Sequence, residues 1–187
     1  MKSNTTLYLL GLVAALCGNI AAASNWETSG YTGLGYVDEN GIDDQSFSSS
    51  TSLVYRFNDT LGVEGGYTRF GDFKDNFDVT GGRAKAEVGI DGFTLGLNAL
   101  INTGDSWYLT GRIGFWAWDA DFKLSVPGTP TLRDSDSGTD LYAGAGFGYN
   151  FTERFGAGLG VSYYSVDVGG SNTGVYIVGL NTHYSFK

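Results

Sequence analysis

Three charged residues occupy positions that suggest a buried ion network. Arg56 and Glu64 lie on either side of a short polar turn, and Arg112 lies in a later stretch of alternating residues. Counting alternate positions places all three on the face opposite the large apolar side chains. Because buried charges must be paired or hydrated, we expect Glu64 to bind one or both arginines. Such a network either seals an interior or lines a gated or narrow pore.

His183 is the only histidine and therefore the one candidate imidazole base. Catalysis at a histidine requires a positioned nucleophile and an acid that orients the ring. Ser162 and Ser185 could serve as nucleophiles, but their spacing does not require that role. We therefore expect His183 to point inward beside Asn181 and Ser185, without enzymatic activity.

Most of the 20 acidic residues lie between the predicted strands described below. The segment 134–140 (DSDSGTD) resembles the start of a calcium loop, but its glycine comes one position early and no glutamate closes the frame. We expect solvated segments that repel neighbours or hold divalent ions near lipid phosphates, and no metal site or cofactor. A net charge of −9 also argues against nucleic-acid binding.

The first 23 residues have the layout of a secretory signal. Lys2 provides a positive start, 7–16 (LYLLGLVAAL) form an apolar run, and three alanines precede a cleavage position before Ser24. Leu16 is too large for the position before a lipidated cysteine, so lipidation of Cys17 is not expected. The predicted mature domain, 24–187, then contains no cysteine and no disulfide.

Period-2 alternation recurs after residue 23 and predicts eight strands, with no convincing helical period. The stretch 82–91 either extends the fourth strand or forms a hairpin of its own. The predicted strands are 30–37, 47–57, 61–70, 92–101, 106–118, 139–149, 155–166 and 175–186.

The connections between these strands alternate in length. Short polar turns at 58–60, 102–105 and 150–154 are rich in Asn, Asp and Gly. Longer connections are predicted at 38–46, 71–81, 119–138 and 167–174. This alternation is typical of outer-membrane barrels, which have short periplasmic turns and long external loops.

The last predicted strand shows which face meets lipid. One face has aromatic residues at both ends and aliphatic residues between them, which is the pattern of a lipid-facing band. This face comprises Tyr176, Val178, Leu180, Thr182, Tyr184 and Phe186, and the opposite face comprises Ile177, Gly179, Asn181, His183 and Ser185.

Glycine and small polar residues fill the opposite face of most strands, where a soluble sandwich would expose them and weaken its strands. Inside a narrow barrel, glycine instead relieves crowding beside Tyr142, Tyr164 and Trp116. We expect Trp107, Trp116 and Trp118 to mark membrane interfaces or a lumen plug. The predicted fold is an all-β, eight-stranded, antiparallel, up-and-down transmembrane β-barrel whose last strand pairs with its first.

The chain resembles the small OmpA/OmpX-type barrels of the outer membrane protein β-barrel domain family over about residues 26–187. The resemblance rests on 55–59 (YRFND) before a turn, on 112–115 (RIGF), on the signal peptide and on the aromatic-ended last strand. It implies that Tyr184 and Phe186 belong to a terminal signal read by the barrel-insertion machinery. Family members usually end in Phe, whereas here Lys187 follows Phe186.

These features predict a monomeric protein of the Gram-negative outer membrane that contacts outer-membrane lipid and lipopolysaccharide. Its expected role is envelope integrity or surface interaction, with a lumen plugged by polar and charged side chains. The main alternative is a narrow porin-like channel for small solutes. A lipid-modifying enzyme and a soluble lipocalin-like carrier are further alternatives.

Overall fold

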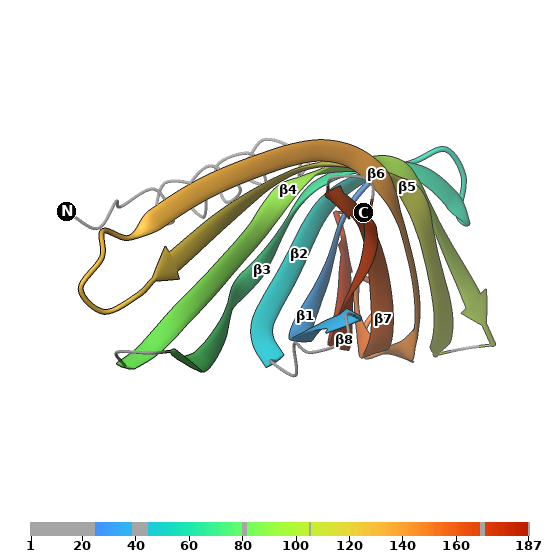
Figure 1. The fold of residues 1–187 in the computed structure, drawn as a ribbon. Helices are drawn as coiled ribbons and strands as arrows, with labels where there is room; N and C mark the ends of the chain where they lie inside the picture. Colours follow the sequence, from blue (N-terminus) through green and yellow to red (C-terminus); the bar gives the residue numbers. More distant parts are fainter. Residues whose placement is uncertain (1–24, 39–44, 80–81, 105, 169–170, 187) are drawn as a thin grey trace.

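The computed structural model describes residues 25–38, 45–79, 82–104, 106–168 and 171–186. These residues form eight antiparallel strands in chain order: β1 (Trp26–Asp38), β2 (Gln45–Arg56), β3 (Leu61–Val79), β4 (Gly82–Thr103), β5 (Trp107–Ser125), β6 (Leu132–Asn150), β7 (Phe155–Val168) and β8 (Ser171–Ser185). Each strand pairs with its neighbour in sequence, and the sheet closes into a barrel (Figure 1). The predicted fold class is confirmed.

The barrel closes through a long ladder between β1 and β8. Paired residues run from Glu27 opposite Ser185 to Asp38 opposite Gly174. Closure gives both terminal strands a hydrogen-bonding partner, which is required where no water can satisfy a backbone group. Among the described residues, no helix is long and apolar enough to cross a membrane.

Two of the predicted long loops are wrong, because β3 to β6 continue through them. The β3–β4 ladder reaches Val79 opposite Gly82, and the β5–β6 ladder reaches Leu124 opposite Leu132. The stretch 82–91, for which the sequence left two possibilities, is part of β4. Backbone pairing does not require apolar side chains, so hydrophobic alternation does not identify these polar parts of the strands.

Other boundaries also differ from the prediction. The first strand begins at Trp26 instead of residue 30, and the predicted connection 167–174 is shortened by β7 and β8, which end and begin at Val168 and Ser171. Residues 39–44 of the first predicted long connection lie outside the described residues. The short turns predicted at 58–60, 102–105 and 150–154 are confirmed in place, although residues 102–103 belong to β4 and residue 150 belongs to β6.

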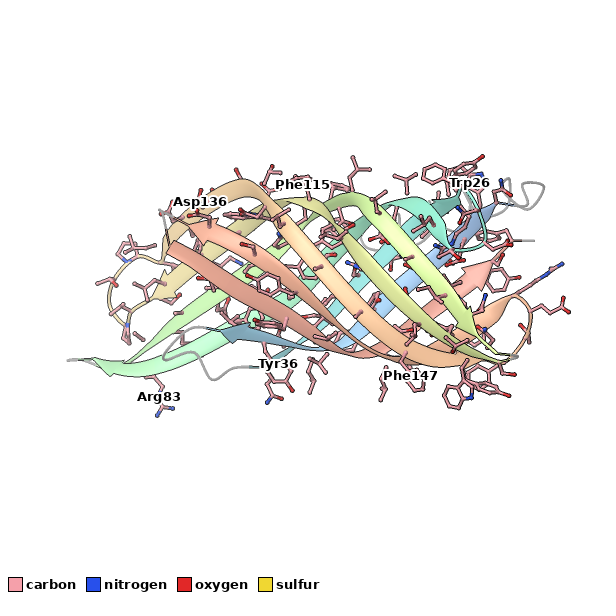
Figure 2. The ribbon with its side chains drawn as sticks, turned by 90° about the vertical axis from the view of Figure 1, so that its right-hand side faces the viewer. Trp26, Tyr36, Arg83, Phe115, Asp136 and Phe147 are labelled. Atoms are coloured by element: carbon pink, nitrogen blue, oxygen red, sulfur yellow. The ribbon has the colours of Figure 1, made fainter. Side chains whose placement is uncertain are left out.

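The apolar and small faces of the strands are oriented as predicted. Leu159 and Val178 lie on the outside, 72% and 49% exposed. Gly160 faces the lumen, where an added Cβ would lie 2.7 Å from the Tyr31 ring. Figure 2 shows Phe115 and Phe147 projecting outward between two ends of the barrel, one marked by Trp26 and the other by Asp136 and Arg83. The apolar surface therefore covers the outside of the barrel.

The lumen is less polar than the sequence suggested. Toward the end with extended hairpins, it contains a cluster of buried apolar and aromatic side chains, which are Phe70, Phe73, Ile90, Trp116, Trp118, Ala120, Tyr142, Tyr164, Val166, Val175 and Ile177. Several of these positions were assigned to loops, where no face could be predicted. The lumen thus has a polar half toward the short turns and an apolar half toward the hairpins.

Candidate functional site

The centre of the lumen is organised around one carboxylate. Glu64 on β3 is completely buried and accepts hydrogen bonds of 2.7 Å from Asn98 Nδ2 and from the Tyr142 hydroxyl. Arg112 Nε lies 3.6 Å from Glu64 Oε1. Three strands therefore contribute polar groups to the same buried charge, as is needed to offset its loss of hydration.

Arg112 is held by hydroxyl groups and aromatic rings. Both of its terminal nitrogens lie 3.3 Å from Ser50 Oγ, and Nη2 also donates to the Tyr164 hydroxyl. Its guanidinium carbon lies 4.8 Å from the ring centres of Tyr31 and Tyr142. These cation–π contacts and hydrogen bonds fix the arginine across the lumen.

A second ion pair lies nearer to the short turns. Arg56 donates to both carboxylate oxygens of Glu27, at 2.6 and 3.2 Å, and to the backbone oxygen of Asn98 at 3.1 Å. The sequence associated Glu64 with one or both arginines. The structure places Arg112 beside Glu64 and gives Arg56 a different partner, Glu27.

Sequence reasoning missed Glu27 because it precedes the predicted start of the first strand. Extending the alternation backward from Tyr31 through Ser29 would have placed Glu27 on the lumen face. Its register partner on β2 is Val54, two residues from Arg56. This diagonal position is within reach of long side chains on neighbouring strands.

The predicted tryptophans occupy both kinds of site. Trp107 lies on the outside and stacks on Phe147 at 4.9 Å. Trp116 and Trp118 are buried in the lumen, where their indole N–H groups donate at 2.7 Å to the Ser165 backbone oxygen and to Asp140 Oδ2. Trp107 therefore lies on the outer surface, and Trp116 and Trp118 lie inside the lumen.

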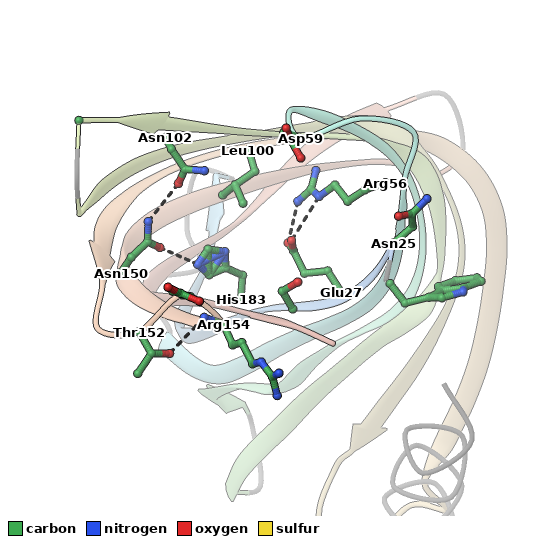
Figure 3. Close-up of a pocket in the computed structure, with 14 residues that line it drawn as sticks. Asn25, Glu27, Arg56, Asp59, Leu100, Asn102, Asn150, Thr152, Arg154 and His183 are labelled. Atoms are coloured by element: carbon green, nitrogen blue, oxygen red, sulfur yellow. Dashed lines mark hydrogen bonds and ion pairs between the residues drawn. The ribbon is translucent and has the colours of Figure 1, made fainter. Parts of the chain in front are cut away.

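A cavity of about 450 Å³ opens at the end that carries the short turns (Figure 3). The Glu27–Arg56 ion pair and His183 line it. His183 Nε2 lies 2.9 Å from Asn150 Oδ1, and its ring stacks on Tyr108 at 4.6 Å. These contacts fix the imidazole against the wall, and the predicted inward position of His183 agrees with the structure.

The acidic segment 134–140 does not form a calcium-type loop. It lies within β6, where extended backbone sends successive side chains to opposite faces. Asp134 and Asp136 instead accept hydrogen bonds from the backbone N–H of the following residue, at 2.9 and 2.8 Å. Within the described ranges, no group of three or more His, Cys, Asp or Glu side chains could hold a metal ion.

The residues of the expected insertion signal lie at the end of β8. Tyr184 is 40% exposed on the outside, and the Tyr184 and Phe186 rings are 5.4 Å apart. The backbone N–H of Phe186 donates to the Trp26 oxygen at 3.0 Å, which attaches the end of the chain to β1. Their recognition by the insertion machinery stays a prediction.

Comparisons with known proteins agree with this geometry. The family model for the outer membrane protein beta-barrel domain matches residues 9–186. Outer membrane protein A of Shigella flexneri is 25% identical over 177 residues, which is 88% of this chain and 49% of that protein. The chain thus spans about half the length of the curated relative that it matches.

Solved structures show the same fold at low sequence identity. The attachment invasion locus protein Ail of Yersinia pestis, crystallised with the heparin analogue sucrose octasulfate, is 22% identical with a TM-score of 0.56, covering 86% of this chain and 98% of that one. Neisserial surface protein A is 14% identical with a TM-score of 0.57, covering 86% and 96%.

Proposed function

The chain belongs to the outer membrane protein β-barrel domain family, and from this premise we propose that it is a closed integral barrel of the Gram-negative outer membrane. Its proposed role is envelope integrity or surface contact. The coarser statement, an outer-membrane-type β-barrel, follows from family membership and fold. The finer proposal rests on the outer surface and on the filled lumen.

The outer surface supports membrane placement because aromatic residues bound an apolar band. On β8, Tyr176 and Tyr184 lie on the outer face with Val178 and Leu180 between them. Eight residues at about 3.4 Å each, tilted by about 40°, span roughly 20 Å along the barrel axis. This is close to the roughly 25 Å apolar band of outer-membrane barrels.

The observation that carries the proposal is that two layers of side chains occupy the lumen. Glu64 and Arg112 form the polar layer with Tyr142, while Trp116 and Tyr164 lie in the apolar layer; all five are at most 4% exposed. An eight-stranded barrel is only wide enough for such side chains. A continuous aqueous path is therefore not expected.

Ion conductance in planar bilayers tests this proposal. The wild-type barrel, purified and inserted into a bilayer, should show no steady single-channel current. Replacing Arg112, Tyr142, Trp116 and Tyr164 together by alanine should produce a current, because these changes remove side chains from both layers. The matched variant Trp107→Ala removes an outer ring and should remain closed. A steady wild-type current would favour the narrow channel instead.

Membrane placement has a separate test. The folded protein should sediment with outer membranes and migrate differently in gel electrophoresis before and after heating. Recovery of the folded protein in the soluble periplasmic fraction would contradict both the closed barrel and the narrow channel.

We also propose that the protein has no catalytic activity. The contacts of His183 with Asn150 and Tyr108 account for its position without a reaction. Cells producing wild type or His183→Ala should therefore show the same lipid A and phospholipid profiles by mass spectrometry. A modified lipid present only with the wild type would contradict this proposal.

The terminal residues support a proposal about biogenesis. If Phe186 is part of the insertion signal, Phe186→Ala should lower the amount of barrel assembled in cells by several-fold. Refolding in detergent should remain efficient, because Phe186 takes no part in either ion pair of the lumen. Equal losses in cells and in detergent would indicate a purely structural role, and no loss would exclude the signal.

A further inference from the structure

The cavity at the end with the short turns has the size and enclosure of a small-molecule site. Its volume of about 450 Å³ lies within the range of such sites, which is roughly 300–1,000 Å³. Side chains from β1, β2, β4, β6 and β8 surround it. Beyond His183 the lumen is filled by Tyr108, which is 1% exposed, stacks on the imidazole and donates to Asn181. A ligand would therefore enter from the short-turn end and stop at His183.

Glu27 offers acceptor capacity to this cavity. Its side chain is 5% exposed, and each carboxylate oxygen accepts one hydrogen bond from Arg56. Because an ionised carboxylate has about four lone-pair sites, about two remain for a ligand. Arg56 also donates to the backbone oxygens of Thr60 and Asn98, so its own N–H groups are largely used within the protein. The ion pair thus presents mainly an acceptor to the cavity.

The hydrogen bonds of His183 determine which of its nitrogens can accept. Asn150 Nδ2 donates to Asn102 Oδ1 at 3.0 Å, which directs Asn150 Oδ1 to His183 Nε2 at 2.9 Å. Because an amide oxygen only accepts, Nε2 carries the proton, and Nδ1 of the neutral ring is an acceptor.

Strand register brings these two acceptors together. Glu27 is opposite Ser185 in the β1–β8 ladder, so His183, two residues away, is its diagonal neighbour on the same lumen face. Diagonal neighbours are roughly 7–8 Å apart, and long side chains reach across that distance. A single nitrogen between the two side-chain tips can therefore donate to both.

The charges around the cavity favour a cation. Asp59, Glu153 and Arg154 are exposed in the two turns at its mouth. Together with the Glu27–Arg56 pair, the lining has three acidic and two basic side chains, which leaves an excess of negative charge. A concave site with charge of one sign concentrates counter-ions of the other sign.

One part of the wall is apolar. Leu100 on β4 is 8% exposed and lines the cavity. Figure 3 shows it among polar side chains, between Asn102 and Arg56. A ligand that combines a charged nitrogen with a short methylene chain would match both kinds of surface, since the chain gains by contact with Leu100.

We propose that this cavity binds small aliphatic amines, with an ammonium group that donates to Glu27 and His183 and a methylene chain that lies against Leu100. An ammonium has three donors and no acceptor, and its hydrogen bonds to a carboxylate are of the strong, charge-assisted kind. An anionic ligand would instead meet an Arg56 that already donates to four protein oxygens. This site goes beyond the proposed role and does not depend on whether the lumen conducts.

Isothermal titration calorimetry of the purified, folded barrel in an uncharged detergent at fixed low salt tests the proposal. The probes are cadaverine, its permethylated analogue, which keeps both charges but has no N–H group, and glutarate, which has carboxylates at the same spacing. The variants are Glu27→Gln, His183→Phe and Arg154→Gln. The control Glu87→Gln removes one negative charge from β4 at the opposite end.

We expect the wild type to bind cadaverine, to bind the permethylated analogue about tenfold or more weakly, and to give no signal with glutarate. Glu27→Gln should weaken cadaverine binding about tenfold, and His183→Phe, which keeps a ring against Tyr108, should weaken it several-fold. Arg154→Gln should tighten binding because a repelling cation leaves the mouth, an effect that damage to the fold would not produce. Glu87→Gln should bind like the wild type.

A wild type that binds no cadaverine would overturn the proposal. So would equal binding of cadaverine and its permethylated analogue, equal binding by wild type and His183→Phe, or no tightening in Arg154→Gln. Heat-dependent mobility shows which variants are folded, and if Glu27→Gln is not, His183→Phe and Arg154→Gln decide. A barrel that stays closed in bilayers but binds no cadaverine fails this inference alone, whereas one that binds cadaverine and conducts fails only the proposed closed lumen.

Discussion

At the scale of single residues, the lumen is governed by one buried acid. Glu64 has no exposed surface, and its environment includes Arg112, Asn98 and Tyr142. A buried ion pair adds little net stability compared with an apolar pair of equal volume, but removal of one partner leaves an uncompensated charge. We therefore expect Glu64 to contribute more to how the lumen is packed than to the net stability of the barrel.

Removing the carboxylate should be costly for this reason. We expect Glu64→Ala to lower the free energy of unfolding by about 3–5 kcal/mol, because Arg112 stays buried without its partner. Urea unfolding of the barrel in lipid vesicles measures this change. Adding Arg112→Met to Glu64→Ala should recover part of the lost free energy of unfolding. If the losses of the two single variants instead add up in the double variant, Glu64 and Arg112 are not coupled.

Glycine at lumen positions provides a second prediction at the residue scale. An added Cβ at Gly96 would lie 2.3 Å from the Ile113 oxygen and 2.5 Å from the Tyr142 hydroxyl, whereas at Gly111 it would meet nothing within 4 Å. Gly96→Ala should therefore destabilise the barrel by more than about 2 kcal/mol, and Gly111→Ala by less than about 1. Equal urea midpoints for both variants would contradict the close packing of the lumen.

At the scale of elements, β3 to β6 extend beyond their neighbours. The β2–β3 ladder ends at Ser49 opposite Arg69, and the β6–β7 ladder ends at Tyr142 opposite Tyr164. The remaining parts of β3 to β6 form a four-stranded sheet beyond the rim. Charged side chains on an unpaired edge, such as those of Arg133 and Asp134, oppose non-specific strand pairing.

The extent of the apolar band can be tested with two leucines of similar exposure on different strands. Leu97 is 57% exposed in the middle of the apolar band, and Leu132 is 66% exposed at the start of the extended part of β6. Leu97→Arg should cost about 2–4 kcal/mol of folding free energy in a bilayer, and Leu132→Arg less than about 1. Similar costs for both variants would contradict the placement of the band.

At the scale of the whole molecule, closure depends on β1 and β8, which are distant in sequence. Thr32 is opposite Leu180 in their ladder, whereas Thr182 is a diagonal neighbour of Thr32. A disulfide requires Cα atoms within about 7 Å, which a direct pair satisfies and a diagonal pair generally does not.

Cysteine pairs therefore test closure in a chain lacking the segment 1–23. Thr32→Cys/Leu180→Cys should form a disulfide after folding and oxidation, detected as a mobility change that a reducing agent reverses. Thr32→Cys/Thr182→Cys should form it poorly. A barrel open between β1 and β8 would give no disulfide with either pair.

The fold was largely predictable because the membrane imposes a strong rule on side chains. Alternation identified the core of every strand and the lipid-facing side, as residues such as Leu159 and Val178 illustrate. The extended parts of β3 to β6 were missed because outside the lipid either face can be polar. In the candidate site, Glu64 and Arg112 were found from their type and face, while Glu27 was lost with an incorrectly placed strand start.

The sequence by itself determined the class of structure, since apolar alternation, inward glycine and aromatic ends agree with a barrel in lipid and conflict with a soluble sandwich. Only the tertiary structure decided which charge meets which. Arg56 and Arg112 are equivalent in sequence terms, but strand register and tilt bring Glu27 to one and Glu64 to the other. The Glu64–Arg112 pair joins β3 to β5 across the lumen, so it depends on the stagger of non-neighbouring strands, which local residue pattern does not contain.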